Sequence, residues 1–119
     1  MDALPMFTWP VAALPDVLRA GRYPFDDRGF EVCYRSPTHA LHVYEYHGAI
    51  RIGDRSFTLA PGDATISPVG IETRYDLPRR GHHWCVHFHP VEIRGASCRL
   101  PTKVALGSLR TRVVEAIQR

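Results

Sequence analysis

The segment 59–70 constrains the fold of this chain more than any other. It opens with a tight turn at 61–63, where Pro61 presets one backbone angle and Gly62 can adopt the positive φ that the turn needs. A short strand, expected to be buried, follows at 64–67, and Pro68 and Gly70 close it. A turn, a short buried strand and a second turn are typical of a small antiparallel β-barrel.

Alternating patterns around this segment predict further short strands with no helix between them. Strands are expected at 30–35, 39–47, 71–76 and 82–89, and the clearest hairpin is at 49–59 with its turn at Gly53. The predicted fold is therefore mainly β, an antiparallel barrel or sandwich.

The two ends of the chain have different patterns. Residues 1–28 are rich in proline and turn-forming residues, which predicts an arm wrapped around the core. Near the other end, apolar residues spaced by three, four and four positions share one helical face, with Ser108 as the expected N-cap: Leu106, Leu109, Val113 and Ile117. We therefore expect an arm at 1–28, a barrel at 29–101 and the start of a helical region at 102–119.

Composition narrows the class of protein. The chain has 119 residues, 45% of them apolar and 23% charged, which fits one globular domain. Its 3 cysteines form no C-x-x-C pair, and we find neither a signal peptide nor an apolar run of about 20 residues, so a cytoplasmic protein without membrane contact is expected. The net charge of +3 is scattered rather than gathered in a stripe, which argues against direct nucleic-acid binding.

The glycines and prolines of 59–70 resemble the second conserved motif of the cupin fold. That motif runs glycine, five residues, proline, one residue, glycine, two residues, histidine; Gly62, Pro68 and Gly70 match it, and Thr73 stands at the histidine position. The resemblance implies a cupin-like antiparallel β-barrel, also called a double-stranded β-helix or jelly roll. The apolar spacing near the chain end adds a C-terminal α-helix to this prediction.

The first cupin motif has lost its metal ligands. If Gly48 is the glycine of that motif, its glutamate position falls on Leu41 and its two histidine positions fall at or near Arg35 and Pro37. Leu, Arg, Pro and Thr cannot supply the converging donors of a catalytic metal. We therefore expect no metal and no other cofactor at the cupin positions.

Histidines elsewhere leave a second possibility open. Cys85, His87 and His89 alternate along one predicted strand, opposite Trp84, Val86 and Phe88, but a metal site would need a further ligand such as His42 or His47. The alternative, which we favour, is that these histidines lie on a half-polar face, because nothing in the sequence identifies a fourth ligand.

Glu45 also has two interpretations. If Leu41 faces the barrel interior, strict alternation places Val43 and Glu45 there too, where a carboxylate needs a partner or a polar ligand. We favour the other interpretation, in which Glu45 lies at the strand end in water, because strand ends and bulges break alternation.

Over residues 20–118 the chain resembles the N-terminal effector-binding and dimerisation domain of AraC-type transcriptional regulators. The resemblance rests on the order and spacing of HALHVYEYHG at 39–48, the hairpin 50–59, PGD at 61–63, ISP at 66–68, HWCVHF at 83–88 and LP at 100–101. It implies a barrel that binds a small effector, helices that pair two subunits, and two helix-turn-helix motifs that bind DNA. No residue ends the terminal helix before Arg119, so DNA contact is expected only through a domain outside this sequence.

We therefore expect a sensor domain and not an enzyme. The candidate ligand-binding residues are Tyr34, His42, Tyr44, Trp84 and His87. The apolar face of the terminal helix either packs on the barrel or forms a homodimer, and we expect the homodimer, through Leu106, Leu109, Val113 and Ile117. Two alternatives stay open: a barrel that binds nothing, and a small metal-dependent cupin enzyme with a displaced site made of His42, Cys85, His87 and His89.

Overall fold

We describe the protein from a computed structural model. The structure describes residues 6–10, 14–25, 31–34, 37–76, 81–92 and 95–118; for Met6, 23–25 and 31–34 it describes only the backbone.

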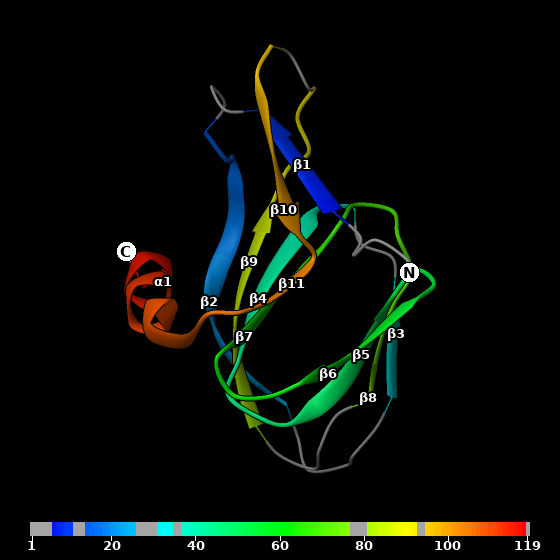
Figure 1. The fold of residues 1–119 in the computed structure, drawn as a ribbon, viewed down its shortest axis with the longest axis vertical. Coiled ribbons are helices and arrows are strands. Elements are labelled where there is room, and N and C mark those ends of the chain that lie inside the picture. Colours follow the sequence, from blue (N-terminus) through cyan, green and yellow to red (C-terminus); the bar gives the residue numbers. More distant parts are fainter. Residues whose placement is uncertain are drawn as a thin grey trace.

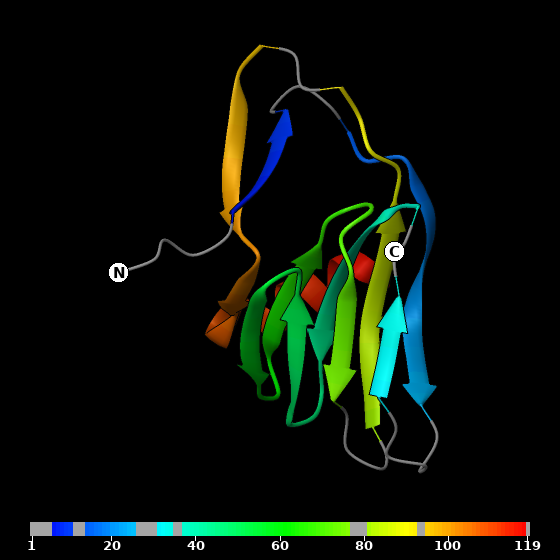
Figure 2. The same ribbon diagram turned by 90° about the vertical axis from the view of Figure 1, so that its right-hand side faces the viewer.

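Within these residues the chain forms two facing antiparallel sheets, a two-stranded ribbon and one C-terminal helix (Figures 1 and 2). The five-stranded sheet runs in the order β11 (Lys103–Ala105), β7 (Asp63–Ser67), β4 (His39–Tyr44), β9 (Gly81–Phe88), β2 (Val17–Phe25). The four-stranded sheet runs β3 (Glu31–Tyr34), β8 (Thr73–Asp76), β5 (Gly48–Ile52), β6 (Arg55–Leu59). The ribbon pairs β1 (Met6–Pro10) with β10 (Ser97–Pro101), and a 3-10 turn η1 (Gly107–Leu109) leads into α1 (Arg110–Ile117). The predicted mainly β, cupin-like architecture is confirmed.

The core lies between the two sheets. Alternate residues of β4, β5, β6 and β8 point inward, and the cluster they form is at most 5% exposed: Tyr44, Tyr46, Ile50, Ile52, Leu59 and Tyr75. Burying a large apolar side chain contributes about 1.5–3 kcal/mol. This cluster therefore holds the sheets together and determines which residues face the interior.

The turn chemistry expected from the sequence is confirmed at two places. Gly53 has φ +61° in the β5–β6 hairpin, and Gly62 has φ +92° before β7. Asp63 closes the second turn, because its Oδ2 accepts a 2.9 Å hydrogen bond from Ala60 N and its own N donates to Ala60 O at 3.0 Å. Glycine meets this backbone requirement at the least steric cost.

Residues 17–25 differ from the expected arm, since they form β2 and pair antiparallel with β9 along its length. The prediction was wrong because Gly21 and Pro24 suggested turns. β2 is an edge strand of the five-stranded sheet, and an edge strand tolerates proline, which has no amide hydrogen to donate.

The region after residue 101 also differs from the prediction. Residues 103–105 form β11 against β7, and α1 begins only at Arg110. The N-cap is Leu109 without a side-chain hydrogen bond, so Ser108 is not the cap. The open edge of β7 offers a backbone pairing that a helical pattern cannot reveal.

The outer face of the five-stranded sheet carries α1, which contacts β9 (Figure 1). At the other end, Phe7 and Trp9 of the β1–β10 ribbon pack edge-on against Phe88, with ring centroids 6.2 and 5.3 Å away. Among the described residues we find no helix that is long and apolar enough to cross a membrane.

Candidate functional site

A chain of hydrogen bonds crosses the interior from one sheet to the other. The Tyr44 hydroxyl bonds Thr65 Oγ1 at 2.6 Å and the Tyr75 hydroxyl at 3.3 Å. The Tyr75 hydroxyl in turn bonds His42 Nδ1 at 3.1 Å. All four residues are buried, so each bond is formed away from water and fixes the orientation of its partners.

Three histidines from β4 and β9 lie together on this inner face. The ring of His42 lies edge-on to His83 and to His87, with centroids 5.0 and 6.3 Å apart. A hydroxyl also binds Nδ1 of each of the β9 rings: Tyr46 bonds His83 at 3.2 Å and Thr38 bonds His87 at 3.1 Å. Hydroxyl partners therefore fix the orientations of all three imidazoles.

The surroundings of these histidines favour their neutral forms. Burial lowers the pKa of His42 well below 6.5, and repulsion from His83 and His87 lowers it further. Burial is also the main reason that the pKa of His83 falls to about 4, and burial lowers the pKa of His87. The interior is thus lined by uncharged imidazoles and hydroxyls near neutral pH.

Two inward hydroxyls lack partners. Ser67 Oγ and Thr73 Oγ1 are the buried side-chain oxygens that form no hydrogen bond within the described part of the chain. Thr73 is fully buried and stands at the histidine position of the cupin motif. A buried polar group without a partner costs about 1–3 kcal/mol, so these two positions require a reason other than packing.

We expect Thr73→Val to raise the free energy of unfolding by about 1 kcal/mol, because it removes an unpartnered hydroxyl and keeps the shape of the side chain. Urea unfolding measures the change. Thr65→Val is the matched control: it is equally buried, but its Oγ1 bonds Tyr44, so that variant should lose about 1 kcal/mol instead. Destabilisation by both substitutions to the same extent would contradict the prediction.

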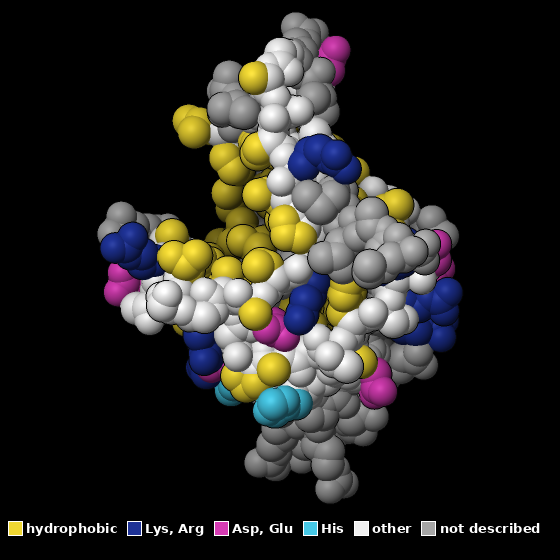
Figure 3. Space-filling model, viewed as in Figure 1, with side chains coloured by type: hydrophobic (Ala, Val, Ile, Leu, Met, Phe, Trp, Pro, Cys, Tyr) yellow, Lys and Arg dark blue, Asp and Glu magenta, His cyan; other side chains and the backbone are white. Residues whose placement is uncertain are grey.

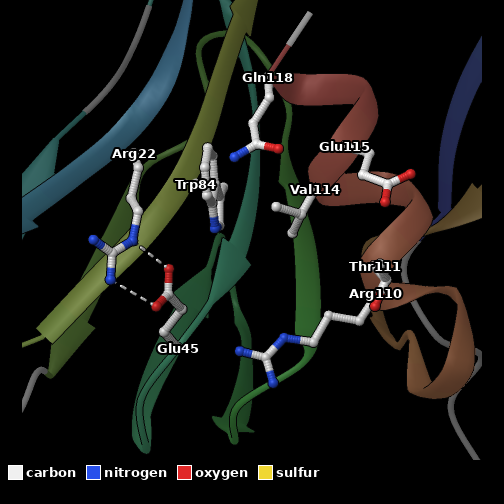
Figure 4. Close-up of a pocket in the computed structure, with 8 residues that line it drawn as sticks. All are labelled: Arg22, Glu45, Trp84, Arg110, Thr111, Val114, Glu115 and Gln118. Carbon is white, nitrogen blue, oxygen red and sulfur yellow. Dashed lines mark hydrogen bonds and ion pairs between the residues drawn. The ribbon is translucent and has the colours of Figure 1, made fainter.

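The opposite face of β9 borders a groove of about 510 Å³ beside α1 (Figure 4). Trp84 of β9 and Val114 of α1 line it from opposite sides, and Arg22 binds Glu45 through two hydrogen bonds of 2.8 and 2.9 Å. The same ion pair lowers the pKa of Glu45. β9 therefore carries the histidines on its inner face and contacts the helix with its outer face.

The structure brings three of the five candidate ligand residues together. His42, Tyr44 and His87 share the inner face, whereas Trp84 lies on the outer face next to α1. The backbone of Tyr34 pairs with Thr73, and its side chain lies outside the described part of the structure. Strand alternation separates Trp84 from His87 because their positions differ by an odd number.

Glu45 lies just after β4, at the strand end as favoured, but on the outer face with Arg22. The alternative in which Leu41, Val43 and Glu45 face the interior is wrong, because the inward set is His42, Tyr44 and Tyr46. Tyrosine hydroxyls that bond His42 and His83 account for this choice, since these polar groups satisfy one another across the interior.

The displaced metal site gains little support from the geometry. Cys85 shares the inner face with His42 and His87, but burial raises the pKa of its thiol to about 12, which disfavours the thiolate that binds metals. His89 lies beyond the end of β9. Among the described residues, we find no group of three or more His, Cys, Asp or Glu side chains arranged to hold a metal ion.

Sequence patterns did not indicate Thr65, Tyr75 or His83 as residues of the interior site. A signal for His83 was present, because it precedes Cys85 and His87 by two and four positions on one strand. Tyr75 comes from the other sheet, and no local pattern connects it to β4.

The four residues expected at a dimer interface lie just before η1, at its end and within α1. Leu109 is 54% exposed, whereas Leu106, Val113 and Ile117 are half-buried within the chain itself. Packing on the barrel therefore accounts for part of the apolar face.

Comparisons with known proteins support the fold. The conserved protein SPY1581 of unknown function from Streptococcus pyogenes superposes with a TM-score of 0.53 at 19% identity, over 76% of this chain and 80% of that one. A protein from Ralstonia eutropha, provisionally assigned as a mannose-6-phosphate isomerase, superposes with a TM-score of 0.46 at 20% identity, over 68% of this chain and 91% of that one. No protein-family model matches the sequence, and no curated protein matches it. The superposition on the Streptococcus pyogenes protein shows a shared fold, a small domain of facing antiparallel sheets.

Proposed function

We propose that this domain senses a small molecule in an AraC-type transcriptional regulator, without catalysing a reaction. An effector bound between the sheets would change the position of α1, and α1 would act on a DNA-binding helix-turn-helix domain outside this chain. The observation that carries the proposal is the position of β9, which presents His83 and His87 to the interior and Trp84 to the helix.

Three features support a binding role for the interior. It contains buried hydroxyls without partners, neutral imidazoles with fixed orientations, and a sheet whose outer face contacts a helix. A ligand that prefers one arrangement of β9 and α1 would shift the population of the two arrangements by its difference in affinity.

A metabolite panel tests the proposal. A ligand that binds only the folded state raises Tm, so at least one small molecule is expected to do so. The same compound should change the fluorescence of Trp84, measured in a Trp9→Phe background. Absence of any Tm shift would favour a barrel that binds nothing, and stoichiometric zinc, iron or manganese in protein purified without added metal would favour the metal-dependent enzyme.

Homodimerisation through α1 is the second part of the proposal. Figure 3 shows hydrophobic side chains gathered in a hollow between α1 and the β1–β10 ribbon. Several large apolar residues on the surrounding elements are exposed: Val17 at 48%, Leu18 at 58%, Leu100 at 42% and Leu109 at 54%. A face of this kind suits an isologous contact with a second copy.

Leu109→Glu is expected to weaken the dimer at least tenfold, because it places a charge in an apolar contact. Sedimentation equilibrium measures the dissociation constant. Leu14→Glu is the control, since Leu14 is 89% exposed and lies outside α1. A wild-type chain that stays monomeric at high concentration would refute the dimer.

A further inference from the structure

The two unpartnered hydroxyls lie at the same end of the interior, one on each sheet. Ser67 is the last residue of β7 and Thr73 is the first residue of β8, and the turn between them is closed by a 3.3 Å hydrogen bond from Ile71 N to Pro68 O. Ser67 is 3% exposed and Thr73 is fully buried. Both point inward, because Thr65 and Tyr75, two positions away, form the hydrogen bonds of the interior.

The strand register identifies the neighbours of these hydroxyls. Ala40 pairs with Ser67 on one side and with His87 on the other, so only a methyl group separates the hydroxyl from the imidazole on that sheet. On the facing sheet, Ile52 pairs with both Thr73 and Arg55. Residues paired directly across antiparallel strands share a face, which places Arg55 on the inner face as well.

Two arginines contribute positive charge at this end. Arg19 of the edge strand β2 pairs with His87; its side chain is exposed, and its charge contributes to the lowered pKa of His87. Asp63, the buried acidic residue of β7, lies at the other end of that strand, where Lys103 Nζ is 3.5 Å from its carboxylate. Among the described residues, the charged positions that the strand register places nearest to Ser67 and Thr73 are thus the half-buried Arg55 and the exposed Arg19.

We propose that this end of the interior binds a small organic carboxylate, with the hydroxyls of Ser67 and Thr73 as donors to its oxygens. The inference rests on the proposed function, which it makes more specific by naming the class of effector. A carboxylate accepts hydrogen bonds from several donors at once, and the charges of Arg55 and of the exposed Arg19 favour an anion over a cation at this end. The same arginine charges would repel a cationic ligand.

The test compares propionate with propionamide, which have nearly the same shape and differ in charge. Each is titrated into the protein in a buffer free of carboxylate and phosphate, and NMR follows the amides of Ser67, Thr73 and His87. Propionate is expected to shift these signals saturably and to bind at least tenfold more tightly than propionamide. The variants Ser67→Ala and Thr73→Val should each weaken propionate about tenfold, the loss of one hydrogen bond to a charged group.

Thr58→Val is the control variant, because Thr58 is exposed on β6 and outside the inward set; it should leave propionate binding unchanged. Equal affinity for propionamide, or propionate binding that neither variant weakens, would overturn the inference. Absence of saturable shifts with propionate would overturn it too and would indicate that water satisfies the hydroxyls.

The inference and the proposed function can fail separately. An uncharged metabolite that raises Tm and shifts the same signals would contradict the carboxylate inference and would support the proposed sensor function. A metabolite panel without a Tm shift, together with saturable propionate binding, would leave the anion site standing and reject the sensor.

Discussion

Acidification from pH 7 to pH 4 is expected to remove about 3 kcal/mol of folding stability through His83 alone, because its pKa is about 4 in the folded protein and 6.5 as a model value. In this window the unfolded chain binds more protons than the folded one. Stability present at pH 7 is therefore lost as pH falls below about 6.5 and toward about 4. His42, with its lowered pKa, adds to the loss in the same direction. Small domains have about 5–15 kcal/mol in total, so the effect is large.

Urea unfolding at several pH values between 7 and 4 measures this loss. His83→Asn should flatten the pH dependence, because it removes the titrating ring and keeps a polar group beside Tyr46. His47→Asn is the control, since His47 is exposed, and it should follow the wild-type curve. A curve for His83→Asn that matches the wild type would show that His83 does not cause the loss.

Tyr44→Ala is expected to lower the free energy of unfolding by about 3–5 kcal/mol, the range for large aromatic residues in a core. Tyr44 is fully buried, packs edge-on against Tyr46 with centroids 5.5 Å apart, and bonds Thr65 and Tyr75. The substitution removes a large side chain at the contact between the sheets and leaves two buried hydroxyls short of a partner. Chemical denaturation followed by circular dichroism provides the measurement.

Tyr44→Phe separates packing from hydrogen bonding. It keeps the ring and removes only the hydroxyl, so its expected cost is about 1–2 kcal/mol. If Tyr44→Phe were as destabilising as Tyr44→Ala, the hydrogen bonds rather than the ring would hold the sheets together. If neither variant changed stability, the interior described for this protein would be wrong.

These predictions concern the residues on which the proposed sensor depends. The imidazoles of β9 that stay neutral through burial face the interior, and the next residue along the strand, Trp84, faces α1. Thr73→Val should likewise stabilise the ligand-free protein while weakening the binding of a carboxylate. Opposite effects on stability and binding are common where a site contains groups that packing does not satisfy.

The sequence by itself determined the strands and turns whose signals are local. Gly53 and Gly62 marked turns because a positive φ favours glycine, and alternation marked the hairpin 49–59 because strand side chains repeat every two residues. Three of the residues gathered on the inner face, His42, Tyr44 and His87, were also named from sequence. Which face of the strands forms the interior could not be predicted, since a period of two leaves either face free to point inward.

Only the tertiary structure decided which face of the strands forms the interior. Tyr75 of one sheet reaches His42 of the other, 33 positions away in sequence, and this contact turns the polar side of β4 inward and leaves Glu45 outside with Arg22. Other tertiary contacts explain two further outcomes. Pairing with β9 makes residues 17–25 a strand, and the packing of α1 on β9 places Trp84 beside the helix. These outcomes depend on pairing between distant segments, whose energies come from burial and hydrogen bonding across the sheets and which no local pattern encodes.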